Sequence, residues 1–431
     1  MTTWTRIAMI AALTLLPTGA LKGQTVVTVS PDGPISTIEE AVRTAEDGAR
    51  IIVEAGRYRV TTVEIRKPVT ISGEPGAVLV AVDGNQIFTV LADGVTIEGL
   101  TLRGISTSFI DDRAAIRIER SAGCRIANNF IDDAFFGIYL AKANDCVIAA
   151  NVFTARKPTQ TTSGNGIHLW YSEDIDIRDN RIRGHRDGIY LEFSSNVVVT
   201  NNEARRNRRY GLHFMFSDNC RYLDNTFAEN DAGVAVMYSR DVEMMRNRFV
   251  DNWGPSAFGL LLKDITDSRI EGNVIEGNTV GIYAEGVNRV QVMHNDFVEN
   301  GRAVKLLANS METEFRANNF VANTFDVTTN SRQSYSTFEG NYWDAYRGYD
   351  LDRDGTGDVP FYPVRLFALI VERNEPAIIL MRSLFVHLMD AAERVLPTLT
   401  PKAVVDERPL MKRARTPDLH AAQSPIIPQP S

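Results

Sequence analysis

Apolar and polar residues alternate in short runs along most of the chain. The run Gly-Leu-His-Phe-Met-Phe, which begins at Gly211, is one of many such segments. Alternation with a period of two residues is typical of a β-strand that packs one face on a core. The strand predicted here carries His213 and Met215 on its outer face. Its inward-facing residues are Leu212, Phe214 and Phe216.

These strands belong to a repeat of about 22 residues. In each repeat a short strand closes with an asparagine, and most of these asparagines lie 22 to 24 residues apart. They are Asn129, Asn151, Asn180, Asn202, Asn225, Asn247, Asn273, Asn295, Asn319 and Asn341. One repeat cannot bury its own apolar face, so the repeats are expected to stack. The pattern predicts an all-β solenoid, namely a right-handed parallel β-helix of about 13 coils over residues 24–348.

We expect the asparagines to occupy the turns between strands. Asparagine tolerates a left-handed backbone, and stacked asparagine side chains can hydrogen-bond from one coil to the next. A leucine-rich repeat has a similar period, but its Leu-x-x-Leu-x-Leu frame is missing from this chain.

The N-terminal segment departs from the repeat. Residues 1–23 have the features of a secretory signal peptide, with Arg6 before a short apolar run, so we expect export to the periplasm. That run is too short to span a bilayer. Residues 36–47 predict a helix that covers the first coil, with Ser36 and Glu39 forming a capping box.

The C-terminal segment departs from the repeat as well. Residues 349–396 predict an Asp-rich loop followed by a helical cap, which Pro376 divides into two parts. The second part, Ala377–Val395, is apolar on most of its turns. It either caps the last coil alone or also presents an apolar surface to a membrane-protein partner. Residues 397–431 are rich in proline and are expected to be disordered.

One outer face of the predicted solenoid concentrates unusual side chains. The coils lengthen mainly ahead of the strand that reads Gly-Ile-x-Leu, and insertions gathered at one corner commonly mark the working side of a solenoid. The outward positions of this strand carry aromatic, charged, His and Met residues, which we interpret as a partner-binding stripe. The stripe includes Tyr139, Trp170, Tyr190, Glu192, Lys263, Tyr283 and Glu285.

A candidate copper site lies within this face. Met215 and Met237 are 22 residues apart, so they should stack in adjacent coils, with His213 on the same side. Thioethers together with an imidazole suit Cu(I) better than Mg²⁺ or Ca²⁺. His168 lies two coils away and would need a partner protein to complete a site. An apolar docking patch without metal is the alternative.

A second candidate metal site follows the coils. Asp350, Asp352, Asp354 and Asp358 alternate with other residues in a Gly-containing loop, a spacing that allows a loop to wrap around Ca²⁺. Phe361 stands where a regular EF-hand has its last glutamate. An Asp/Gly turn without metal is the alternative.

Charge and motifs narrow the function classes. The net charge of −8 argues against a nucleic-acid partner. Glycoside hydrolysis needs two carboxylates that face each other across a bond, and the coils contain neither the Asn-Thr-Asp motif of polygalacturonases nor the Asp-Pro-His-Glu motif of alginate epimerases. An enzyme acting on polysaccharides is therefore a weak alternative.

The three cysteines share one repeat position and are interpreted as small core residues.

Several segments together resemble the NosD family. They read RYGLHFMFSDNCRY, GVAVMYSRDVEM, GLLLKDITDSRIEGN, NTFDVTTNSR, GNYWDAYRGYDLDRDGTGDVPF and DERPLMKR. The likeness covers nearly the whole chain after the signal segment.

The resemblance implies a periplasmic β-helix protein that is not an enzyme. Such a protein would work with an ABC transporter, whose membrane subunit the C-terminal helices would contact. It would receive copper from a lipoprotein chaperone and support assembly of the copper–sulfide centre of nitrous oxide reductase. The resemblance assigns no ligands, so the copper site at His213, Met215 and Met237 remains an inference from spacing. A polysaccharide-binding or -cleaving β-helix protein is the alternative.

Overall fold

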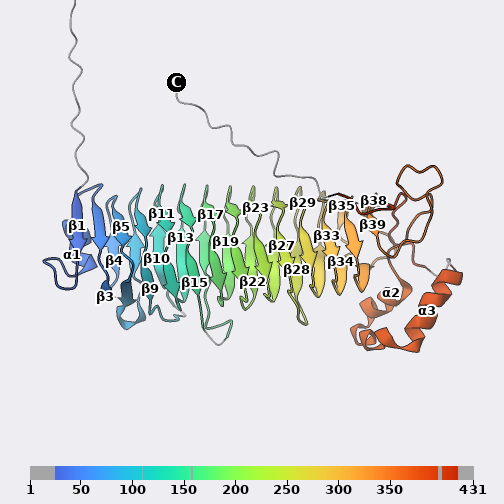
Figure 1. Ribbon diagram of the computed structural model, residues 1–431, viewed down its shortest axis with the longest axis horizontal. Coiled ribbons are helices and arrows are strands. Elements are labelled where there is room, and N and C mark those ends of the chain that lie inside the picture. The colour runs from blue at the N-terminus through green and yellow to red at the C-terminus, as the bar shows by residue number, and fades with distance from the viewer. Residues whose placement is uncertain (1–24, 109, 157–158, 397–399, 416–431) are drawn as a thin grey trace, which may run out of the picture.

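The chain forms a long rod built from three parallel β-sheets. A computed structural model describes residues 25–108, 110–156, 159–396 and 400–415 (Figure 1). The sheets contain 14, 13 and 12 strands, and we name them A, B and C in that order. From β2 to β37 each coil adds one strand to sheet A, then one to B, then one to C. The predicted parallel β-helix is confirmed.

Sheet A consists of β1 (Val26–Val29), β2 (Arg50–Val53), β5 (Thr70–Gly73), β8 (Thr96–Glu98), β11 (Arg125–Ala127), β14 (Val147–Ala149), β17 (Asp176–Arg178), β20 (Val198–Thr200), β23 (Arg221–Leu223), β26 (Glu243–Met245), β29 (Arg269–Glu271), β32 (Gln291–Met293), β35 (Met311–Arg316) and β38 (Tyr335–Glu339). Sheet B consists of β3 (Gly56–Val60), β6 (Ala77–Ala81), β9 (Thr101–Arg103), β12 (Phe130–Asp132), β15 (Val152–Thr154), β18 (Arg181–Arg183), β21 (Glu203–Arg205), β24 (Thr226–Ala228), β27 (Arg248–Val250), β30 (Val274–Glu276), β33 (Asp296–Val298), β36 (Asn319–Val321) and β39 (Tyr342–Trp343). Sheet C consists of β4 (Val63–Ile65), β7 (Phe88–Val90), β10 (Ala114–Glu119), β13 (Phe136–Ala141), β16 (Ile167–Trp170), β19 (Asp187–Glu192), β22 (Tyr210–Met215), β25 (Ala232–Met237), β28 (Phe258–Lys263), β31 (Val280–Glu285), β34 (Arg302–Leu306) and β37 (Phe325–Thr329).

The core is a column of inward side chains that repeats from coil to coil. Leu212 and Val234 are register partners in adjacent coils, and both side chains are fully buried. Gly211 is required by close approach, since a Cβ there would lie 2.6 Å from the carbonyl oxygen of Gly233. The prediction that Phe216 faces inward is wrong. The strand ends at Met215, and Phe216 has a φ of 52° that turns its side chain out, leaving it 43% exposed.

A ladder of buried asparagines joins the coils between sheets A and B. In each step the backbone N–H and the side-chain amide of one asparagine donate to the amide oxygen of the next, at 2.8 and 3.0 Å for Asn202 and Asn225. The expected role of asparagine in left-handed turns is wrong, because the residue before it adopts that conformation, as Asn201 does with a φ of 54°. In the coil before the last, Asn318 rather than Asn319 joins the ladder.

A second asparagine ladder, between sheets B and C, was not predicted. Its members are Asn207, Asn230, Asn252, Asn278, Asn300 and Asn323. It ends at the carboxylate of Asp326, which accepts from the amide of Asn323 at 3.3 Å. Buried polar groups are therefore paired along both corners.

A short helix covers the N-terminal end of the rod. Helix α1 (Ile38–Thr44) buries Ile38, and Figure 1 shows it beside the first coil. Thr37 rather than Ser36 is its N-cap and accepts from the backbone N–H of Glu40 at 3.3 Å. The Glu39 carboxylate instead accepts from Thr61 at 2.9 Å, so the predicted capping box is wrong. A 3₁₀ turn, η1 (Val82–Gly84), follows β6.

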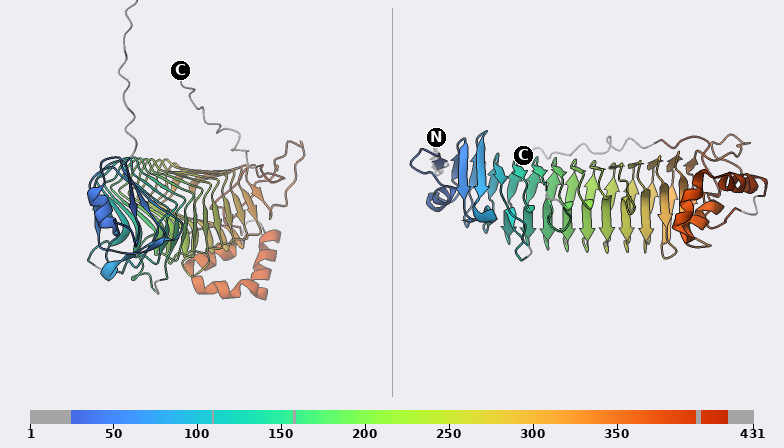
Figure 2. Two further views of the ribbon diagram at one scale, coloured as in Figure 1. Left: turned by 60° about the vertical axis from the view of Figure 1, so that its left-hand side comes forward. Right: turned by 90° about the horizontal axis from the view of Figure 1, so that it is seen from below.

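Three helical segments lie to one side of the C-terminal end of the rod (Figures 1 and 2). They are α2 (Leu366–Arg373), the 3₁₀ segment η2 (Glu375–Arg382) and α3 (Leu384–Val395). Phe367 of α2 packs against Phe325 of β37, with ring centroids 6.2 Å apart. Lys305 of β34 pairs with Glu372 of α2 at 2.7 Å.

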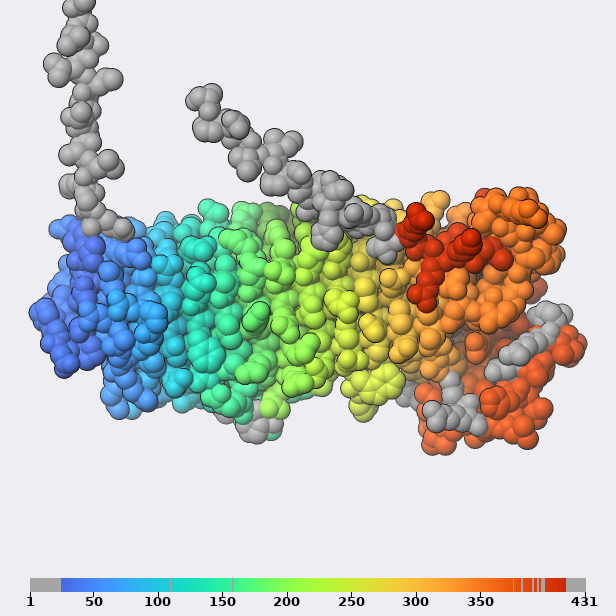
Figure 3. Space-filling model, viewed as in Figure 1, coloured from blue at the N-terminus to red at the C-terminus, as the bar shows by residue number. Residues whose placement is uncertain are grey.

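The segment after α3 lies against the last coils (Figure 3, red). The fully buried Asp406 carboxylate accepts from the backbone and side chain of Asn341 at 3.0 and 3.1 Å. It also accepts from the indole N–H of Trp343 at 3.0 Å. The expectation of disorder from residue 397 onward is therefore wrong for residues 400–415. Residues 397–399 and 416–431, and the predicted signal peptide at 1–23, lie outside the described residues.

Candidate functional site

The outer face of sheet C brings Met215 and Met237 together. The two residues are register partners on adjacent strands, and both side chains are half-buried. The hydroxyl of Tyr190 lies 3.5 Å from the sulfur of Met215. Glu192 precedes the pair in the same row and Lys263 follows it. Met215 therefore lies between the phenol of Tyr190 and its register partner Met237.

Beside the methionines runs a column of stacked rings. His168 lies between Tyr139 and Tyr190, with centroid separations of 4.6 and 4.8 Å, and Tyr190 stacks on His213 at 4.5 Å. Arg117 lies 4.8 Å from the centroid of the Tyr139 ring. Burial raises the pKa of Tyr139 to about 12.

The prediction that this column forms part of an open stripe is wrong. Tyr139, His168, Tyr190 and His213 do lie on the outer side of sheet C, but each is less than 10% exposed. The rings cover one another from coil to coil, tilted by 39° and 58° in the first two steps and stacked at 16° between Tyr190 and His213. Tyr210 adds a further ring 4.8 Å from His213. In the neighbouring row, Trp170 and Glu192 remain partly exposed.

A buried carboxylate adjoins His213. Asp187 is fully buried, and its oxygen lies 3.8 Å from Nδ1 of His213, 3.4 Å from Arg186 and 4.0 Å from Arg209. Burial alone would raise the pKa of Asp187, but His213 and the two guanidinium groups lower it overall. Burial lowers the pKa of His213, although Asp187 opposes this shift. The pair therefore consists of an ionised carboxylate and a neutral imidazole at neutral pH, and the neutral imidazole is the form that binds metals.

Sequence reasoning missed Asp187. The signal was a carboxylate at a repeat position that holds Phe136, Tyr210 and Ala232 in other coils. A buried carboxylate at a position where neighbouring coils carry apolar groups needs a partner of opposite charge. Arg209 is one such partner.

His168 has its own partners two coils from His213. Its Nδ1 lies 3.2 Å from the amide nitrogen of Asn165, and its Nε2 lies 3.8 Å from the carboxylate of Glu192. The interaction with His168 lowers the pKa of Glu192. Because the Tyr190 ring separates the two histidines, they do not share one ion directly.

Buried polar atoms without a hydrogen-bond partner gather at this place. Among the described residues they include Oδ1 of Asn165, Nε2 of His168, Oδ1 of Asp187 and both ring nitrogens of His213. Buried polar groups in native proteins are rarely left unpaired. Water or a ligand can supply the partners that such atoms lack.

The stripe changes character beyond Met237. Lys263 pairs with Glu285 at 3.8 Å, and the hydroxyl of Tyr283 donates to Glu285 at 3.2 Å. Lys305 lies 5.8 Å from the centroid of the Tyr283 ring and also holds Glu372. These groups already have partners, so this part of the stripe has no free ligand set for a metal.

The Asp-rich loop brings three of its four predicted residues together. One carboxylate oxygen from each of Asp350, Asp352 and Asp354 lies within 4.8 Å of the others. Asp358 accepts instead from the backbone N–H of Leu351 at 2.7 Å. Arg408 pairs with Asp354 at 3.1 Å, which neutralises part of the cluster.

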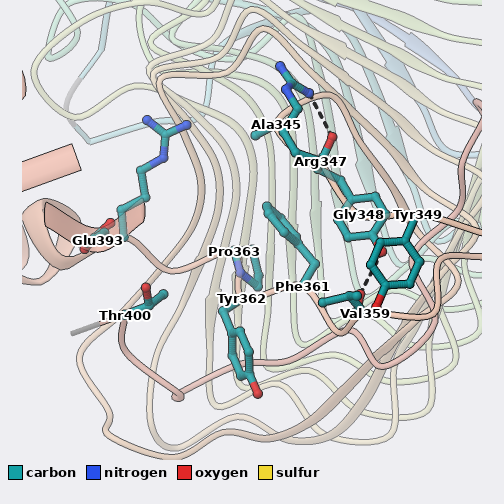
Figure 4. A pocket seen from close by; sticks show the side chains of 12 residues that line it. Ala345, Arg347, Gly348, Tyr349, Val359, Phe361, Tyr362, Pro363, Glu393 and Thr400 are labelled. Atoms are coloured by element: carbon teal, nitrogen blue, oxygen red, sulfur yellow. Dashed lines mark hydrogen bonds between the residues drawn. The ribbon is translucent and has the colours of Figure 1, made fainter. Parts of the chain in front are cut away.

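A cleft of about 870 Å³ separates the end of the rod from the helices. Figure 4 shows the rings of Tyr349, Phe361 and Tyr362 along it, with Glu393 of α3 on the far side. Arg347 is held at the rim by the carbonyl oxygen of Tyr346 at 2.8 Å. The cleft is far from the methionine pair in the sequence and has no ligand atoms in common with it.

The C-terminal helices expose apolar side chains. They are Ile378, Ile379, Leu380, Leu384, Phe385 and Leu388, each more than 40% exposed. Within the part of the chain that the structure describes, no helix has the length and apolar character needed to cross a bilayer.

The three sheets define a parallel β-helix protein, and the outer face of sheet C carries two methionines in register. Residues 154–348 match the family model described as "Periplasmic copper-binding protein (NosD)". The chain is 30% identical over 393 residues to the "Probable ABC transporter binding protein NosD" of Pseudomonas aeruginosa, covering 85% of this chain and 89% of that protein. It is 26% identical to the protein of the same name from Stutzerimonas stutzeri, covering 83% and 86% of the two chains. The chain belongs to the NosD family.

Solved structures confirm the fold alone. The family 28 exopolygalacturonase of Yersinia enterocolitica superposes with a TM-score of 0.55 at 11% identity, covering 75% of this chain and 79% of the enzyme. Folds host many unrelated functions, so this likeness carries no activity over to the chain.

Proposed function

We propose that this protein is a periplasmic assembly factor that passes Cu(I) toward the copper–sulfide centre of nitrous oxide reductase. It works with an ABC transporter and a copper chaperone lipoprotein and is not itself an enzyme. The transporter in the names of its relatives and the copper in the family description support this proposal.

The observation that carries the proposal is the register pair of Met215 and Met237. Two half-buried thioethers in adjacent coils give a soft ligand set that selects Cu(I) over hard cations. His213 lies two residues from Met215 and is held neutral, so it can supply an imidazole nitrogen. Since the site is open on one side, copper bound there remains accessible to a second protein. Copper is the cargo in this scheme rather than a resident cofactor.

The exposed apolar residues of η2 and α3 support docking to the membrane subunit of the transporter. Leu384 and Phe385 of α3 are 73% and 51% exposed. The next residue of the same helix, Val386, is buried in a cluster that includes Phe367 of α2. Apolar side chains left exposed on a folded helix mark protein or membrane contacts. Leu384→Glu/Phe385→Glu should abolish co-purification with the transporter and leave Cu(I) binding intact.

Competitive Cu(I) titration of the mature chain tests the copper proposal. The variant Met215→Leu/Met237→Leu conserves volume and should lose at least 100-fold in affinity, about 2.7 kcal/mol. The matched control is Met245→Leu/Met293→Leu, which removes two half-buried methionines from the outer face of sheet A. Equal affinities for the two double variants would disprove the assigned site. Cleavage of polygalacturonate or alginate by the purified chain would favour the polysaccharide alternative.

A further inference from the structure

Four aromatic side chains form a continuous exposed stack at the turn between sheets C and A. They are Tyr171, Phe193, Phe216 and Tyr238, which we call the aromatic ridge. Successive centroids are 4.8, 5.1 and 5.0 Å apart, with interplanar angles of 15°, 4° and 14°. Each ring is between 39% and 49% exposed. The ridge is thus a narrow apolar strip along four consecutive coils.

The fold does not require aromatic residues at these positions. All four residues have φ between 47° and 54°, a left-handed conformation that costs a bulky residue about 1–2 kcal/mol. The next two coils place Asp264 and Gly286 at the equivalent turn, with φ of 50° and 65°. Ring stacking returns about 0.5–1.5 kcal/mol per pair, which at best offsets the strain. Backbone strain that the local contacts do not more than offset is characteristic of functional positions.

The stacking geometry selects the kind of ligand. Sugars bind aromatic side chains through the ring face, but both faces of Phe193 and Phe216 are covered by neighbouring rings. What remains exposed is a line of ring edges. Ring edges contact apolar side chains and methionine sulfur favourably. The ridge therefore fits a protein surface better than a carbohydrate.

The surroundings of the ridge carry negative charge. Glu173, Asp174 and Asp241 are exposed in the turns beside it. The nearby cations are Lys142, at the equivalent turn of the preceding coil, and Arg240, which pairs with Asp218 at 3.1 Å. A partner with an apolar patch and a basic rim would complement this surface.

The ridge adjoins the methionine pair residue by residue. Phe216 follows Met215 directly, and Tyr238 follows Met237. A protein that reaches the two sulfurs from outside must therefore cover these rings. We propose that the aromatic ridge is the docking site of the copper-carrying protein that loads Met215 and Met237, an inference that rests on the proposed function. Buried aromatic anchors of this kind dominate the affinity of many interfaces.

The variant Phe193→Asp/Phe216→Asp tests the ridge in the full mature chain. Since Asp264 already occupies the equivalent turn, the variant should fold normally. We expect its Kd for the Cu(I)-loaded soluble domain of the copper lipoprotein to rise at least 10-fold. The affinity of the chain alone for Cu(I) should stay unchanged. The matched control is Trp253→Asp/Tyr335→Asp, which removes two rings that are 66% and 63% exposed elsewhere on the rod.

The outcomes separate the ridge from the copper site. An unchanged Kd for the lipoprotein in the ridge variant overturns the docking proposal, even if Met215→Leu/Met237→Leu loses copper. A ridge variant that loses binding of polygalacturonate or alginate oligosaccharides also overturns it, in favour of a carbohydrate surface. If the methionine variant keeps full Cu(I) affinity while the ridge variant loses the lipoprotein, the copper site fails and the ridge stands as a protein-binding surface.

Discussion

The outer face of sheet C has two halves that share one backbone and differ in chemistry. From β13 to β22 its buried row consists of tyrosine and histidine rings in contact from coil to coil, with unpaired polar atoms beside them. From β28 to β34 the same row holds Leu261, Tyr283 and Lys305, and Lys305 pairs with Glu372 of α2. The strand register is continuous through both halves. The fold therefore accepts either arrangement of side chains in this row.

Two buried carboxyl groups sharpen this contrast. The cationic neighbours of Asp187 in the first half lower its pKa despite burial, so it is ionised. Burial raises the pKa of Asp326, on the last strand of the same sheet, to about 7. Sheet C thus carries a fixed negative charge beside the proposed ligands and, at the end of the second asparagine ladder, a carboxyl group that titrates near neutrality.

The largest effect is expected from Asp187→Ala. The change leaves Arg186, Arg209 and His213 around an uncompensated site, and we expect a loss of about 3 kcal/mol in the free energy of unfolding. The control Glu285→Ala breaks a partly exposed pair and should cost less than about 1 kcal/mol. Urea denaturation of both variants measures the difference. Equal losses would show that the two halves do not differ energetically.

A smaller effect with the opposite sign is expected from Asp326→Asn. Because the folded pKa of Asp326 lies above the unfolded value, its contribution to stability is complete below about pH 4 and is lost as pH rises through about 7. The variant should therefore be more stable than the wild type at pH 8, on the order of 1–3 kcal/mol, and equally stable at pH 4. Thermal unfolding from pH 4 to pH 8 checks this. A constant difference across that range would contradict the assignment.

The acid response of the first half should be smaller still. The folded pKa of His213 lies below its unfolded value, so the stability it contributes is present above the unfolded pKa and is lost as pH falls. Hydrogen exchange in β19 and β22 should accelerate more between pH 7 and pH 5 than exchange in β28 and β31. His213→Gln should reduce this acceleration, whereas His294→Gln, at a more exposed position on another face, should not.

The smallest effect is expected from Ca²⁺ at the Asp-rich loop. Asp350 already accepts from the backbone N–H of Gly355, and Arg408 already pairs with Asp354. We expect millimolar Ca²⁺ to change the free energy of unfolding by less than about 0.5 kcal/mol. A clear rise in Tm with Ca²⁺, lost in Asp352→Asn, would show that the loop binds the ion.

Periodicity in the sequence predicted what depends on translation from coil to coil. It placed Met215 against Met237 and gave the parallel strands, because equivalent residues must align when coils stack. It failed at Phe216, where one left-handed residue ends the alternation. It also failed for the burial of His213, which depends on the rings of neighbouring coils. Asp406 was beyond reach, since it contacts Asn341 from 65 positions along the chain.

The return of the chain through Asp406 changes what the C-terminal helices are. They form an insertion held at both ends, because the chain enters them from the last coil and then re-enters the rod to pair with Asn341 and Trp343. A free tail would fray when pulled. A doubly anchored insertion instead transmits any displacement of α2 and α3 to the end of the stacked coils, so mechanical work done on the helices reaches the rod.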